Sequence, residues 1–131
     1  MTKEQALHAF WNSFKLQAFD ENTVPEYTVV NGEVVKLTTP YITYEVAISG
    51  DFETTQILNA SLWYRSTSWQ SITEKATEIY DYIGDGGRMI KIDGGYMKVR
   101  IPADNFAQRM DEPSSNLIRR IVLRVSIEFI I

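Results

Sequence analysis

The final segment of the chain alternates between apolar and polar residues more strictly than any other part. Its apolar positions are Ile121, Leu123, Val125, Ile127 and Phe129, and its polar positions are Arg120, Arg124, Ser126 and Glu128. Because successive side chains of a strand point to opposite faces, this pattern predicts a strand with one apolar face. Another part of the chain must cover that face, which limits the fold to a sheet packed in layers.

Four further segments show strand patterns. Residues 41–48 and 54–65 each alternate, and two hairpins are predicted, one about Asn31-Gly32-Glu33 and one about Asp93-Gly94-Gly95. Asn-Gly between two apolar runs is the strongest short hairpin signal. Residues 102–116 contain two prolines and several polar residues, which predicts a loop.

Two segments have the spacing of amphipathic helices. The first covers residues 2–19, with Ala6, Phe10, Phe14 and Ala18 four residues apart. The second is preceded by the capping hydroxyls of Ser66-Thr67-Ser68, ends near Gly84 and has a strong apolar stripe. This stripe consists of Trp69, Ile72, Ala76, Ile79 and Ile83. We therefore predict an α+β fold, a mainly antiparallel sheet with two helices packed on one face.

A chain of 131 residues is the size of one domain, and residues 1–131 contain no repeat or linker. Acidic residues are concentrated between residues 20 and 53, where the one basic residue is Lys36. The acidic residues of this segment are Asp20, Glu21, Glu26, Glu33, Glu45, Asp51 and Glu53. We expect a hairpin arm at about residues 20–38 to project from the domain. The formal charge of −4 disfavours a dedicated nucleic-acid binder.

The sequence offers little for chemistry. It has no cysteine and a single histidine, His8, for which a structural role is favoured over catalysis. Residues 84–87 are rich in glycine but follow a helix, which indicates a turn and not a phosphate loop. The carboxylates of residues 74–85 lie on the polar face of the second helix, where no desolvated pocket is available for acid–base catalysis. We predict no catalytic residue, no metal and no cofactor.

Several residues are candidates for contacts with a partner. Trp63 lies on the polar face of its strand with Arg65, and tryptophan and arginine together are typical of interface hot spots. Opposite charges are concentrated in two regions, and such regions favour head-to-tail pairing of subunits. The interface candidates are Trp63, Arg65, Glu26, Glu33, Arg119, Arg120 and Arg124.

Three stretches give the chain a family resemblance. PYITY at residues 40–44, ASLWYRSTSW at residues 60–69 and the closing strand from IRRI at residues 118–121 resemble the small tail-completion and tail-terminator proteins of long-tailed bacteriophages. The resemblance covers most of the chain from Pro40 onward and has no catalytic residues to transfer. The less familiar arm leaves open a neighbouring role, as an adaptor or stopper in head-tail joining.

The resemblance implies a structural virion protein. Such proteins form homo-oligomeric rings, usually hexameric, that cap the tail tube and join it to the head connector. The implied partners are other copies of the chain, the tail tube and the head connector. DNA only passes through the lumen and no membrane is involved. Assembly would take place in the cytoplasm of the bacterial host, and the final location would be the virion.

Two other classes are alternatives. A cone-like small-molecule enzyme or ligand-binding domain would enclose a pocket containing Tyr44 and a buried acid. The aromatic first helix, with His8, Phe10 and Trp11, favours this class, but no predicted strand places a carboxylate on its apolar face. The third class is a host-side interaction module without a role in the virion.

Overall fold

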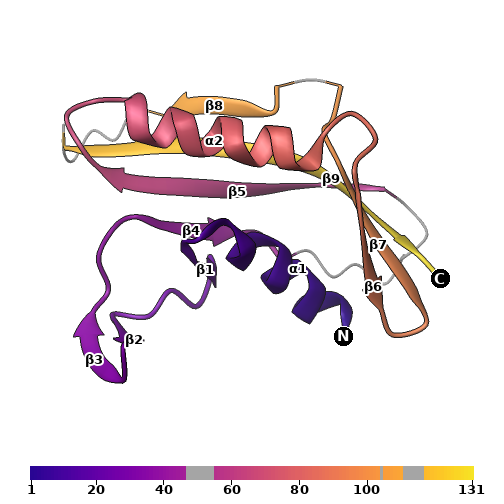
Figure 1. Cartoon of the computed structure of the whole chain (residues 1–131), viewed down its shortest axis with the longest axis horizontal. Helices are drawn as coiled ribbons and strands as arrows, with labels where there is room; N and C mark the ends of the chain where they lie inside the picture. Colours follow the sequence, from indigo (N-terminus) through magenta and orange to yellow (C-terminus); the bar gives the residue numbers. More distant parts are fainter. Residues whose placement is uncertain (47–54, 104, 111–116) are drawn as a thin grey trace.

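A computed structural model describes residues 1–46, 55–103, 105–110 and 117–131 of the chain (Figure 1). The elements, in chain order, are α1 (Lys3–Trp11), the 3-10 helix η1 (Asn12–Phe14), β1 (Gln17–Asp20), β2 (Tyr27–Val30), β3 (Glu33–Lys36), β4 (Tyr41–Tyr44), β5 (Gln56–Arg65), α2 (Gln70–Ile83), β6 (Arg88–Ile92), β7 (Gly95–Arg100), β8 (Ala107–Met110) and β9 (Ile118–Ile130). Most of the ordered elements are strands, and the fold is α+β as predicted.

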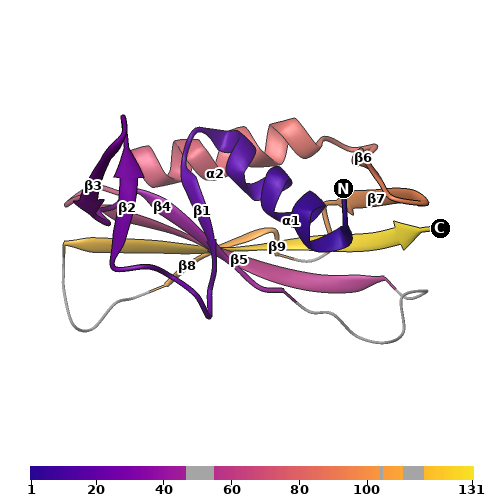
Figure 2. The ribbon, with the colours of Figure 1, turned by 90° about the horizontal axis from the view of Figure 1, so that it is seen from below.

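The main sheet has seven strands and is mixed. Its order is β1-β4-β5-β9-β7-β6, and β8 also pairs with β9. The β1–β4 pairing is parallel, whereas every other pairing between the described strands of this sheet is antiparallel. β2 and β3 form a separate two-stranded antiparallel sheet. The β2–β3 and β6–β7 hairpins lie at opposite ends of the molecule in both ribbon views (Figure 1, Figure 2).

The core lies on one face of the β5–β9 pair. Leu58, Ala60 and Leu62 of β5 and the alternate apolar residues of β9 are buried there, as their spacing predicts. α2 contributes its whole predicted stripe except Trp69, which is half-buried. α1 adds an aromatic group, in which the Phe10 and Phe14 rings make edge contacts 5.4 Å apart.

The first helix is shorter than predicted. Thr2 caps it with a full capping box, but the α-helix ends at Trp11 and the chain then enters β1. Lys15 has a left-handed backbone with φ of 62°, which ends the helical path. Asn12 Oδ1 then accepts a hydrogen bond from the Ala18 N–H. Ala18 is therefore buried on a strand, and its place on the predicted helical stripe was wrong.

The predicted loop over residues 102–116 was also wrong in part, because Ala107–Met110 form β8 against β9. Residues 104 and 111–116 lie outside the described residues. The strand predicted over 41–48 is β4, which ends at Tyr44; residues 47 and 48 and the acidic positions 51 and 53 also lie outside the description. Both predicted hairpins are confirmed by their registers.

The predicted cap of the second helix is one residue displaced. Trp69 occupies the N-cap position and makes no side-chain cap, while the Ser68 hydroxyl accepts from the Gln70 N–H at 3.1 Å. At the other end, Gly84 has φ of 67° and its N–H donates to the Tyr80 carbonyl. The expected glycine thus ends the helix in a conformation that other residues rarely adopt.

Candidate functional site

The sheet face opposite the core, called here the outer face, carries a row of large side chains. Tyr41 of β4, Trp63 of β5 and Arg120 of β9 are register partners across neighbouring strands. The Tyr41 and Trp63 rings stack with centroids 6.4 Å apart, and the Arg120 guanidinium lies 4.7 Å from the Trp63 centroid. These three residues form the aromatic–arginine row.

Two buried hydroxyls hold this row in place. Trp63 Nε1–H donates to Thr43 Oγ1 at 2.9 Å, and Arg120 Nε–H donates to Ser61 Oγ at 3.1 Å. Burial also raises the pKa of Tyr41, whose phenol is protonated at neutral pH in any case. The row is therefore ordered before any partner arrives, so its own side chains would lose little entropy when a partner binds.

The other arginine candidates divide between the two faces. Arg65 and Arg124 are exposed, and their strand positions place them on the outer face with Trp63 and Arg120. Arg119 lies on the core side, where its Nη2 donates to the Thr67 carbonyl at 3.1 Å and its guanidinium lies 5.2 Å from the Trp69 centroid. Arg119 thus stabilises the entry to α2.

The two acidic candidates, Glu26 and Glu33, lie in residues 21–37, called here the arm. The arm contains the β2–β3 hairpin, whose base is closed by a hydrogen bond from the Leu37 N–H to the Glu26 carbonyl. Its exposed apolar residues are Val24, Tyr27, Val29, Val30, Val34 and Val35, and Val34 is 74% exposed. Gln17 Nε2–H donates to Thr28 Oγ1 at 3.0 Å and ties the arm to β1.

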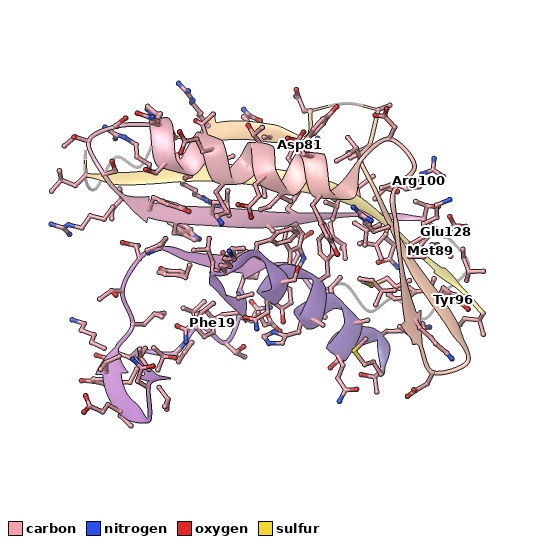
Figure 3. All side chains as sticks on the ribbon, in the orientation of Figure 1. Phe19, Asp81, Met89, Tyr96, Arg100 and Glu128 are labelled. Atoms are coloured by element: carbon pink, nitrogen blue, oxygen red, sulfur yellow. The ribbon has the colours of Figure 1, made fainter. Side chains whose placement is uncertain are left out.

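A second exposed apolar group lies at the other end of the molecule, on the outer face of β6, β7 and β9. Met89, Tyr96 and Ile130 are exposed there, and Tyr96 is the register partner of Ile130. The charged residues around them on these strands are Lys91, Lys98, Arg100 and Glu128. Figure 3 shows Met89, Tyr96, Arg100 and Glu128 gathered at this end. These seven residues are called here the hairpin patch.

The hairpin patch was not predicted, although the sequence contains its signal. In β6 and β7 the buried positions are filled by alternate residues that include Ile92, Met97 and Val99. Met89 and Tyr96 occupy the intervening positions, so both faces of this hairpin carry apolar residues. Strands with two apolar faces are normally covered on both sides.

His8 and Tyr44 form the one contact that a catalytic interpretation would use. His8 Nδ1 lies 2.9 Å from the Tyr44 hydroxyl, and His8 itself is exposed. Burial, followed by the negative charges of Asp20 and Glu4, raises the pKa of Tyr44. A phenol whose pKa is raised stays protonated at neutral pH, so Tyr44 offers no base in this contact.

A pocket of about 310 Å³ lies between α2 and β8. Its lining includes Thr73, Tyr80, Phe106 and Arg109 but neither a carboxylate nor a histidine. Tyr44 is not among the lining residues, so this pocket differs from the one that a cone-like enzyme would need. Within the described ranges, no cluster of three or more His, Asp or Glu residues is arranged to hold a metal ion.

No protein-family model and no curated protein sequence matches the chain. In the part of the chain that the structure describes, neither helix is long and apolar enough to cross a bilayer. The arm, the hairpin patch and the aromatic–arginine row are the candidate surfaces for a partner.

Proposed function

We propose that this chain is a structural virion protein, a ring-forming tail terminator that caps the tail tube of a long-tailed bacteriophage and joins it to the head connector. The class comes from the sequence resemblance. The observation that carries the self-assembly part is the pair of exposed apolar surfaces, the arm and the hairpin patch, at opposite ends of one small domain. Such surfaces mark sites of protein contact.

Different surfaces at opposite ends favour a head-to-tail contact. A contact of this kind uses two unlike patches, and its repetition closes into a ring when the rotation between subunits permits. We expect a hexamer of identical subunits. Arg65 and Arg124, with the aromatic–arginine row between them, then provide a further surface for the tail tube or the head connector.

The proposed arrangement of layers fits this role. We infer that both helices share one face of a mainly antiparallel sheet, because the Tyr82 ring of α2 lies 6.4 Å from Phe10 of α1 and 5.3 Å from Phe14. The outer face is then left for partners. In this proposal the arm is an appendage of a single domain, no cofactor takes part and DNA only passes through the lumen. The ring assembles in the cytoplasm of the bacterial host and ends in the virion.

Light scattering coupled to size exclusion, with negative-stain images of the same fractions, tests the proposal. We expect a closed ring and binding of that ring to the ends of purified tail tubes. A chain that stays monomeric at high concentration and does not bind tail tubes would contradict it.

A further inference from the structure

We propose that the arm of one copy docks onto the hairpin patch of a second copy, and that this single contact is repeated around the assembly. The inference rests on the proposed self-assembly and adds which two surfaces meet. The binding site for the arm is the outer face of β6, β7 and β9 in the second copy.

The arm needs a partner. In the β2–β3 register, Val29 pairs with Val34 on one face, while Val30 and Val35 lie on the other face. A two-stranded hairpin is at best marginally stable in water, and this one leaves apolar side chains exposed on both faces. Covering one face would bury the valines of that face and hold the hairpin in place.

The hairpin patch offers a surface of similar kind on a stable support. Met89 is 52% exposed, and the exposed side chains of Tyr96 and Ile130 lie directly opposite each other on paired strands. The same strands bury Met97, Val99 and Ile127 on their core side, so the support is part of the main sheet. A flexible apolar residue beside a ring is well suited to receive branched side chains.

The charges of the two surfaces are complementary. The arm has three carboxylates, Glu21, Glu26 and Glu33, against Lys36 alone. The hairpin patch has the reverse balance, with Lys91, Lys98 and Arg100 against Glu128. Complementary charges select partner and orientation, and they disfavour the pairing of two arms.

The positions of the two surfaces favour contact between copies. The arm and the β6–β7 hairpin lie at opposite ends of the long axis in both ribbon views (Figure 1, Figure 2). An arm that reaches forward from one subunit meets the patch of the next, and each subunit then has one donor and one acceptor surface.

The absence of cysteine from the chain makes a direct test simple, because any introduced thiol is unique. Val34→Cys and Met89→Cys are prepared separately, mixed and treated with a short bismaleimide. We expect a covalent dimer in this mixture and a ladder of larger species from the double variant. Docking raises the effective concentration of the two thiols, so the dimer yield should exceed that of a control mixture about tenfold. The control pairs Val34→Cys with Asp81→Cys on α2.

Light scattering of the untreated proteins separates the two proposals. An oligomer whose Val34→Cys and Met89→Cys subunits crosslink no better than the control would overturn the docking and leave the proposed function standing. Efficient crosslinking of Val34→Cys with itself would also overturn it, because the arms would then meet each other. A chain that is monomeric throughout would overturn both.

Discussion

The arm and the β5–β9 pair are both antiparallel ladders rich in branched apolar residues, but they bury them very differently. Leu62 and Leu123 are fully buried in the core, whereas Val34 in the arm is 74% exposed. The ladders themselves are alike in hydrogen bonding, so backbone pairing does not account for the difference. The β5–β9 pair is covered by its own chain, and the arm has a cover only in the proposed assembly.

The largest expected effect compares a core residue with an arm residue. Leu62→Ala should lower the free energy of unfolding by about 3 kcal/mol, because it leaves a cavity in the core. Val34→Ala should change the free energy of unfolding by less than about 0.5 kcal/mol, because the exposed side chain buries little surface in the monomer. Urea denaturation at concentrations that favour the monomer measures both. Equal losses would mean that the arm is part of the core.

Two glycines extend the comparison to the turns. A methyl group at Gly95 would collide with the Ile130 carbonyl oxygen, so Gly95→Ala should cost about 3 kcal/mol by displacing β7 from β9. Gly32 in the arm has φ of 81° and open space around it, so Gly32→Ala should cost about 1 kcal/mol. Thermal unfolding ranks the two variants, and a larger loss at Gly32 would contradict this account.

For assembly the ranking should be reversed, and a substitution in the arm should have a large effect. Val34→Ser should raise the concentration of half-assembly about tenfold, because burial of a valine contributes about 1.5 kcal/mol. Tyr80→Ser, which removes an exposed ring on α2 outside both surfaces, is the control and should leave assembly unchanged. Light scattering over a dilution series measures both, and equal effects would show that the arm has no special part in assembly.

A smaller effect is expected from charge. Glu33→Lys should weaken assembly about threefold at low salt, and Lys98→Glu in the same chain should restore it by reversing both signs. Added salt should reduce the difference between these variants, since exposed charges are screened. Asp81→Lys makes the same change on α2 and should have no effect. If Lys98→Glu does not restore assembly in the Glu33→Lys chain, Glu33 and Lys98 do not interact across the interface.

The smallest expected effect is on pH dependence. Burial raises the pKa of Tyr41, Tyr44 and Tyr64, so each holds its proton longer in the folded state than in the unfolded chain. Stability from these shifts is complete below the ordinary tyrosine pKa and is lost as the pH rises through the folded values. The melting temperature should therefore fall above about pH 10, and it should fall less in Tyr44→Phe. An unchanged slope in that variant would contradict the assignment.

The elements that were predicted correctly carry their own signal. β5, β9 and α2 have long periodic patterns, and the two hairpins have glycine turns of known type, so local sequence specifies them. β1 and β8 are four residues each and exist because β4 and β9 offer them an edge, which no local pattern reveals. The end of α1 depends on the left-handed backbone conformation of Lys15, which a lysine in the sequence does not predict.

Strand alternation in the sequence placed Trp63 with Arg65 on one polar face. The contact of Trp63 with Arg120 follows from a register that the sequence does not contain. Arg119 was grouped with them by its position in sequence, although it lies on the other face. The hairpin patch was missed because Met89 and Tyr96 are separated by a turn, and only the β6–β7 register shows them on one surface.

The most direct test of the central claim is the native mass of the full chain over a wide range of concentration. The account predicts one closed multiple of the 15.1 kDa subunit, which Val34→Ser shifts toward the monomer. A mass of 15.1 kDa at every concentration would contradict it, because the arm and the hairpin patch would then be exposed without any self-assembly to explain them.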